Sequence, residues 1–318
     1  MCGIAGVMFK HGETGLSAGR ALIDMLDGCQ HRGPDSTGFA LYEEARPGEL
    51  RLRFLVEEDA DGAGNGSGGG VGHNRDAEGA IADIRSELEA HGAEIVDDER
   101  VGDSYRVVVR FAGDVQKLTY DMEHAGTLIS IGESLDIRKD VGGAHDVDER
   151  FHVREVQGTH GLGHVRLATE SEVKPEAAHP FWATGFTDIA IVHNGQITNY
   201  WKMRRRLERR GFEFHTDNDS ELIAVYLADK LANEVPLEEA LKTSIDDLDG
   251  TFSFLVSTRD EIGYAKDHLA AKPMIMYEND DLIAIASEEV SLNRLFPGRA
   301  LDTREPPPGS YGTWSRST

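Results

Sequence analysis

The first residues of the chain restrict its fold more than any other segment. Residues 2–9, CGIAGVMF, form a nearly continuous apolar run of strand length, which predicts a strand buried on both faces. An apolar period of 3.6 residues then predicts a helix over residues 17–29, with Ser17 as its N-cap and Cys29 on its apolar face. The chain is therefore expected to begin inside its own core.

Composition changes sharply after a predicted strand at residues 51–56. Residues 57–70, EEDADGAGNGSGGG, are acidic and glycine-rich without apolar periodicity, as in a flexible linker or an exposed loop. Helical and strand periods then resume, which predicts a small α+β subdomain inserted at 57–150. Strands and groups of helices follow from residue 161. This grouping predicts an α+β fold for residues 1–318, with two packed sheets covered by helices on both outer faces.

Composition also limits the classes of function. The 318 residues are 39% hydrophobic and carry a formal charge of −24, so binding to nucleic acid or to an anionic membrane is not expected. No apolar stretch reaches membrane-spanning length and no signal peptide is evident, which predicts a cytoplasmic protein. Two cysteines are too few for a disulfide framework, a four-cysteine zinc site or an iron–sulfur cluster. We expect no metal and no cofactor on this chain.

One basic run stands out against the acidic background. Residues 202–210, KMRRRLERR, place Met203 and Leu207 one helical turn apart. This spacing predicts an amphipathic helix with a solvated basic face. A phosphate-binding patch is the alternative interpretation.

Cys2 has a chemical property that an internal cysteine lacks. Its small side chain suits removal of Met1, after which its own α-amine would lie beside its thiol. An α-amine has a pKa of about 7.7 to 8, so at neutral pH part of it is unprotonated and can accept the thiol proton. Nucleophile and base would then come from one residue. Position 2 alone is weak evidence, and an incidental cysteine is the alternative.

Six short segments place Cys2 in a wider pattern. In chain order they are MCGIAG at 1–6, HRGPDSTG at 31–38, GLGHVRLAT at 161–169, AHPF at 178–181, IVHNGQITNY at 191–200 and TDNDSE at 216–221. Together they resemble the ordered motifs of class II glutamine amidotransferases, which are N-terminal nucleophile hydrolases. The resemblance implies a four-layer αββα sandwich, and it implies hydrolysis of L-glutamine to glutamate and ammonia.

Three residues of these motifs match the family's catalytic positions. Cys2 resembles the nucleophile, which attacks the glutamine amide carbon and forms a γ-glutamyl thioester. Asn194 and Gly195 match the oxyanion-hole pair, a side-chain amide N–H and a backbone N–H. In isolation, Asn-Gly would instead predict a hairpin turn. The histidines of the motifs are expected to be structural because the α-amine already serves as the base. Leu167 stands where relatives such as glucosamine-phosphate synthase carry tryptophan.

Four further residues match substrate-binding positions. Arg166 resembles the arginine that binds the substrate α-carboxylate, and Thr169 would add a hydroxyl to the same group. Asp219 matches the carboxylate that pairs with the α-ammonium, in preference to its neighbour Asp217. Either aspartate is alternatively a helix cap. Arg32 matches an arginine that orders the N-terminal residue, with a structural ion pair as the alternative.

Three phrases resemble one subgroup of the family. SLDIRKDVG at 134–142, THGLGHVRLATES at 159–171 and LDGTFSFLV at 248–256 are similar to stand-alone subunits related to glutamate synthase, including that of N-methylglutamate synthase. This implies transfer of ammonia to partner synthase subunits, one like the flavin-containing region of glutamate synthase and one a companion chain. The alternatives are the glutaminase half of a phosphoribosylamine- or asparagine-forming system, and a catalytically silent amidotransferase-like binding module.

Overall fold

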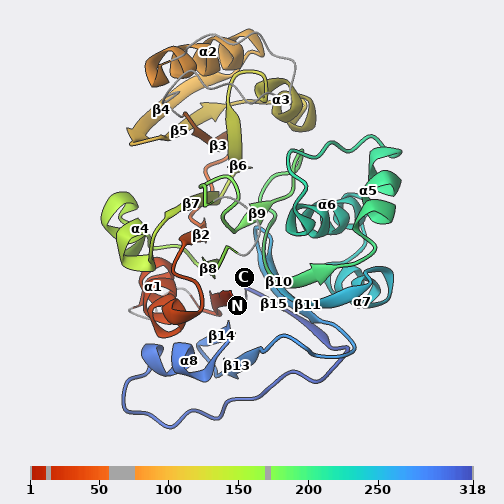
Figure 1. Ribbon diagram of the computed structural model, residues 1–318. Coiled ribbons are helices and arrows are strands. Elements are labelled where there is room, and N and C mark those ends of the chain that lie inside the picture. Colours follow the sequence, from red (N-terminus) through yellow and green to blue (C-terminus); the bar gives the residue numbers. More distant parts are fainter. Residues whose placement is uncertain (1, 12–15, 57–75, 169–172, 317–318) are drawn as a thin grey trace.

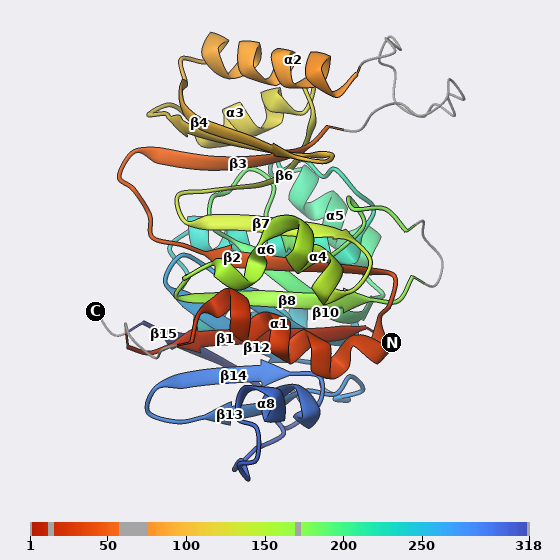
Figure 2. The same ribbon diagram turned by 90° about the vertical axis from the view of Figure 1, so that its left-hand side faces the viewer.

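The computed structural model describes residues 2–11, 16–56, 76–168 and 173–316. These residues form a mixed α/β structure whose strands make sheets of six, five and four strands, with antiparallel pairing. Figures 1 and 2 show the two larger sheets in the body of the molecule and the four-stranded sheet at one end. The predicted α+β composition is therefore present.

The six-stranded sheet contains the start of the chain near its centre. Its order is β13 (Ile275–Glu278), β14 (Leu282–Ala286), β1 (Gly3–Phe9), β8 (His160–Arg166), β2 (Ser36–Tyr42) and β7 (Leu135–Val141). Side chains of β1 alternate between two core clusters, with Ala5 and Val7 on one face and Ile4 and Met8 on the other. The predicted strand buried on both faces is confirmed.

Three helices pack beside this sheet and close its outer face. They are α1 (Ala18–Cys29), α4 (Ala144–Phe151) and α8 (Glu289–Leu295). The α1 helix confirms the prediction from periodicity, because the Ser17 Oγ accepts a 3.2 Å hydrogen bond from the Arg20 N–H. Cys29 is fully buried in the same core cluster, so its predicted packing role is confirmed as well.

The five-stranded sheet faces the other side of the six-stranded sheet. Its order is β15 (Tyr311–Ser315), β12 (Glu261–Lys266), β11 (Gly250–Ser257), β10 (Ala190–Ile197) and β9 (Phe181–Trp182). Leu255 and Ile262 join Ile4 in the core between the sheets. On the opposite face, Ile191 and Phe252 join a core cluster with helices α5 (Tyr200–Glu208), α6 (Asp219–Ala232) and α7 (Leu237–Asp247).

The four-stranded sheet has bounds that differ from the predicted insertion. Its order is β4 (Glu94–Val101), β5 (Ser104–Arg110), β3 (Glu49–Leu55) and β6 (Thr127–Gly132), with helices α2 (Ala77–Ala90) and α3 (Val115–Met122) beside it. Strand β3 precedes residue 57, whereas β7 and all of α4 except its last residue, Phe151, lie within 57–150 and belong to the six-stranded layer. Strand pairing, which a local period does not reveal, sets these boundaries.

Candidate active site

Cys2 lies directly before β1, at the end of a central strand of the larger sheet. Gly3 pairs with Val165 of β8, so Cys2 lies beside the end of that strand. A Cβ atom at Gly3 would lie 2.8 Å from the Cys29 Sγ and 2.9 Å from a Val165 methyl group. The lack of a side chain at Gly3 thus lets the first strand pack closely against α1 and leaves Cys2 half-buried at the strand end.

Three donors from distant parts of the chain converge on Cys2. The Asn194 side-chain amide donates to the Cys2 carbonyl oxygen over 3.1 Å, and the Arg32 Nε donates to the same oxygen over 3.0 Å. The Leu167 backbone N–H points at the Cys2 Sγ over 3.4 Å. The Cys2 Sγ in turn lies 3.9 Å from the Leu167 carbonyl oxygen. The arrangement fixes the main chain of Cys2 and places its thiol against the Leu167 main chain.

The Asn194–Gly195 pair lies within β10, and it does not form a hairpin turn. Gly195 pairs with Phe252 of β11 at φ +144°, and a Cβ atom there would clash with the Thr251 carbonyl oxygen. Only glycine suits this close approach of two strands. Asn194 also donates to the Ser287 Oγ over 3.3 Å, so its amide is held between β14 and Cys2.

Arg32 links Cys2 to an acidic residue that the sequence motifs do not single out. Arg32 ends the short 3₁₀ helix η1 (Gln30–Arg32) and forms an ion pair with Glu288. The Arg32 side chain is only 9% exposed, and Glu288 also lies 3.2 Å from the His31 Nε2. The ion pair and the contact with Cys2 coexist, so the two predicted roles of Arg32 are compatible.

Arg166 is the last residue of β8 and is nearly buried. Its neighbour Leu167 makes the contact with Cys2, which places Arg166 at the same end of the sheet. Antiparallel register sets Arg166 opposite Ser36 of β2. Arg166 therefore lies at the strand end whose next residue contacts Cys2.

The two candidate aspartates have different surroundings. Asp217 pairs with Arg204 over 2.6 Å, and its side chain is 76% exposed. Asp219 accepts a 3.0 Å hydrogen bond from the Ile197 N–H of β10 and lies 3.5 Å from the His193 Nδ1. Burial raises the pKa of Asp219, but His193 and the Ile197 amide outweigh burial and lower the pKa below its usual value. Asp219 therefore carries its charge near the strand of the Asn-Gly pair.

Neither aspartate caps the helix. The N-cap of α6 is Asn218, whose side chain accepts from the Ser220 N–H over 2.8 Å. The alternative interpretation of either aspartate as the helix cap was therefore wrong. Because Asn218 satisfies the helix end, the carboxylate of Asp219 is not used as the cap.

Three motif histidines form a buried group behind the site. The rings of His164 and His179 stack with centroids 4.0 Å apart, and the Ser220 hydroxyl lies 2.7 Å from the His179 Nε2 and 3.1 Å from the His193 Nδ1. Burial lowers the pKa of His164 to about 3 and that of His179 well below its usual value. The packed imidazoles of His164 and His179 are therefore neutral, and they support the strands without adding charge.

Most of the predicted site residues thus lie at one edge of the two sheets. Cys2, Arg32 and Asn194 are joined by hydrogen bonds, while Gly195 and Arg166 adjoin residues of that network. Asp219 is connected to this network only indirectly, through its hydrogen bond with Ile197 of β10. Thr169 lies outside the described residues. Sequence reasoning missed Glu288 and the Ser287 hydroxyl, since no local motif marks the end of β14.

The described residues also bear on the expectations about metals and membranes. Among them, no group of three or more histidine, cysteine, aspartate or glutamate side chains is arranged to hold a metal ion. None of the helices formed by those residues has both the length and the apolar character that crossing a bilayer requires.

Known proteins are similar in sequence to this chain. Residues 164–294 match the family described as "Glutamine amidotransferase domain". A Methanothermobacter thermautotrophicus protein provisionally named glutamine amidotransferase is 40% identical over 96% of this chain and 95% of its own length. The "Glutamine amidotransferase-like protein GlxB" of Rhizobium meliloti is 35% identical over 99% of this chain and 98% of its own length.

A solved structure shares the fold at low sequence identity. Glutamine phosphoribosylpyrophosphate amidotransferase from B. subtilis, in complex with ADP and GMP, matches with a TM-score of 0.60 and 19% identity. The match covers 99% of this chain and 47% of the solved chain. This likeness extends over the whole fold, including the four-stranded sheet.

Proposed function

The chain belongs to the glutamine amidotransferase family, and on that premise we propose that it hydrolyses L-glutamine to glutamate and ammonia at Cys2. We further propose that it is of class II, with residues 1–318 forming an amidotransferase domain that carries an inserted α+β unit. In this proposal the two larger sheets and their helices are the αββα sandwich of N-terminal nucleophile hydrolases.

The convergence of Asn194, Arg32 and Leu167 on Cys2 carries this proposal. After Met1 is removed, the α-amine of Cys2 accepts the thiol proton and the sulfur attacks the glutamine amide carbon. The C–N bond breaks, ammonia leaves with the transferred proton, and a γ-glutamyl thioester remains. Water then hydrolyses the thioester, which releases glutamate and restores the thiol.

In this proposal, residues around Cys2 stabilise the charge of the oxyanion and orient the glutamine substrate. Asn194 and the Gly195 N–H donate to the negative oxygen that develops on the amide carbon. Arg166 binds the α-carboxylate and Asp219 the α-ammonium, so that the amide end of glutamine points toward Cys2. Thr169 adds a hydroxyl to the carboxylate, and Arg32 orders Cys2 through its carbonyl.

The acceptor of the ammonia is proposed to lie on another chain. Resemblance to subunits related to glutamate synthase and N-methylglutamate synthase favours a synthase partner with a flavin-containing region, together with a companion chain. Relatives named "Amidophosphoribosyltransferase" support the alternative of a glutaminase half of another system. The match to one of them covers 54% of this chain at 33% identity, against the nearly full-length match to the GlxB protein.

Terminal processing and cysteine labelling test the nucleophile. Mass spectrometry of native protein should show Met1 removed, because otherwise a peptide bond occupies the α-amine. A diazo-ketone analogue of glutamine should label Cys2, with loss of labelling in Cys2→Ala. Cys29 is the internal control, since burial raises the pKa of its thiol to about 11 and keeps it protonated. Labelling that persists in Cys2→Ala would refute the assignment.

Recovery of bound chains tests the partner. Affinity-tagged protein from the source organism should retain a synthase-type subunit, and addition of that subunit's ammonia acceptor should accelerate glutamine turnover. Turnover that responds instead to a phosphoribosylamine- or asparagine-forming partner would favour the alternative. Complete absence of glutamine hydrolysis with a bound partner present would favour the silent binding module.

A further inference from the structure

Helix α5 presents two parallel rows of side chains, mostly cations, to solvent. Residues four apart on a helix lie one above the other, so Lys202 and Arg206 form one row, and Trp201 and Arg205 form the next. Arg210 and the C-cap residue Arg209 continue these rows just past the end of the helix. Met203 and Leu207 are buried against α6 on the opposite side. The predicted amphipathic helix is confirmed, and its outer face is basic.

Most cations of these rows lack an intramolecular partner. Arg210 pairs with Asp229 over 2.8 Å, but within the described part of the chain no side-chain ion pair or hydrogen bond is found for Lys202, Arg205, Arg206 or Arg209. Cations without an acidic partner are unexpected in a chain with 57 acidic and 33 basic residues. Like charges four residues apart also repel one another along the helix. An external anion would relieve this repulsion.

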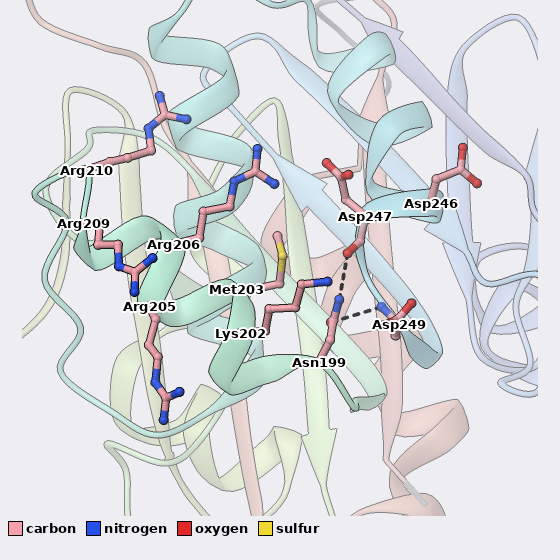
Figure 3. Close-up of a pocket in the computed structure, with 10 residues that line it drawn as sticks. All are labelled: Asn199, Lys202, Met203, Arg205, Arg206, Arg209, Arg210, Asp246, Asp247 and Asp249. Carbon is pink, nitrogen blue, oxygen red and sulfur yellow. Dashed lines mark hydrogen bonds between the residues drawn. The ribbon is translucent and has the colours of Figure 1, made fainter.

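An open groove of about 770 Å³ runs beside the first row. Figure 3 shows Lys202 and Arg206 extending toward the opposite wall, where Asp246, Asp247 and Asp249 lie, while Arg205 points elsewhere. The cations therefore do not converge on one point, as a site for a compact phosphate requires. A broad surface with several separate carboxylates fits this spread better than a small anion does.

Trp201 adds an apolar anchor to the charged face. Its side chain is 57% exposed, an unusual exposure for tryptophan, and it packs against Tyr200 with ring centroids 5.0 Å apart. Tryptophan and arginine are among the residues most enriched as energetic anchors of protein interfaces. A tryptophan next to partnerless arginines therefore indicates a protein-binding surface.

The α5 helix is also connected to the candidate site. It follows β10, the strand of Asn194 and Gly195, after a two-residue link. Arg204 bonds the Tyr200 hydroxyl over 2.6 Å and the Asp217 carboxylate over 2.6 Å, which joins α5 to the loop before Asp219. A protein seated on α5 would thus contact an element that adjoins both the oxyanion pair and the ammonium-binding carboxylate.

We propose that Trp201, Lys202, Arg205, Arg206 and Arg209, which we name the α5 face, form the docking surface for an acidic face of the partner synthase subunit. This assignment rests on the proposed function, since it takes its occupant from there. The chemistry of the α5 face can nevertheless be tested separately from the identity of the partner.

The test compares two double charge reversals with the same change in net charge. The variant Arg205→Glu/Arg209→Glu alters the α5 face, and Arg294→Glu/Arg299→Glu alters exposed arginines in and after α8. Labelled poly-L-glutamate and a labelled DNA duplex serve as probes in fluorescence anisotropy at low and at physiological salt. The partner subunit recovered with the tagged chain is titrated in parallel, and glutamine hydrolysis is measured without partner.

Poly-L-glutamate and the partner should both bind the α5 variant at least about ten-fold more weakly than wild type, with little change for the α8 variant. Hydrolysis without partner should be the same in all three proteins, which shows that the variants fold. Equal affinities in all three, or duplex DNA binding through the same arginines as tightly as poly-L-glutamate, would overturn the assignment. Wild type that hydrolyses no glutamine with its partner would refute the proposed function and leave the probe comparison valid.

Discussion

The side-chain amide of Asn194 and the main-chain carbonyl of Cys2 are joined by a 3.1 Å hydrogen bond across 192 positions of sequence. The bond ties the end of the six-stranded sheet to the five-stranded sheet at the point where both reach the candidate site. It fixes the residue proposed as nucleophile relative to the residue proposed to stabilise the oxyanion. This spatial relation makes each role dependent on the packing of the two sheets.

Asn194→Ala should reduce kcat for glutamine hydrolysis by about 100- to 1000-fold and change KM little, because the lost donor acts on the developing oxyanion. Steady-state kinetics measure both constants. Ser287→Ala is the matched control: it removes the second acceptor of the Asn194 amide but keeps the amide, so its loss of kcat should be smaller. A variant Asn194→Ala that changed only KM would contradict the oxyanion role.

Arg166→Ala should raise KM for glutamine by about ten- to a hundred-fold, the effect expected from loss of a charged hydrogen bond to the substrate carboxylate. Arg166→Lys keeps the charge but loses the planar pair of donors, so it should recover only part of the affinity. Thermal denaturation checks that both variants fold. A large fall in kcat at unchanged KM would mean that Arg166 acts in the transition state.

Gly195→Ala should destabilise the protein strongly and abolish hydrolysis, because the new Cβ would meet the Thr251 carbonyl oxygen. Gly211→Ala is the control at another positive φ, where no atom lies within 4 Å of the place that the new methyl group would occupy. That change should cost only the left-handed backbone strain, about 1–2 kcal/mol, and leave activity intact. Urea denaturation gives both stabilities, and similar values for the two variants would contradict the steric argument.

Acid should destabilise the fold through buried histidines. Burial lowers the pKa of His160 to about 4 and of His164 to about 3, against about 6.5 when unfolded. As pH falls from 6.5 to 4, the unfolded chain binds protons that the folded chain does not, so each histidine removes stability with a slope of up to about 1.4 kcal/mol per pH unit.

The variant His164→Phe isolates this effect. It keeps an aromatic ring for the stack on His179 and removes one titrating group. Urea denaturation between pH 6.5 and 4 should therefore show that the free energy of unfolding falls less steeply with acid in the variant than in wild type. The difference in slope should correspond to the uptake of one proton. Parallel pH profiles for wild type and variant would show that His164 does not cause the acid sensitivity.

Elements with a strong local period could be predicted from the sequence. The β1 strand, the α1 helix with its Ser17 cap, and the amphipathic α5 helix follow from contiguous apolar patterns, which act over a few residues. The β4 strand was missed, since its residues are mostly exposed and acidic and show no apolar alternation. These residues form a strand because they pair with β5, which their composition does not predict.

The candidate site also has some features that the sequence predicted and others that only the tertiary structure decided. Cys2, Arg166 and the Asn194–Gly195 pair lie in motifs whose residues are adjacent in sequence, so the sequence alone predicted them as site residues and indicated the amidotransferase family. The contacts of Cys2 with Leu167 and the position of Glu288 beside Arg32 were decided by tertiary structure. The physical reason is distance along the chain: the Arg32–Glu288 pair spans 256 positions, and only the packing of two sheets brings such residues within bonding range.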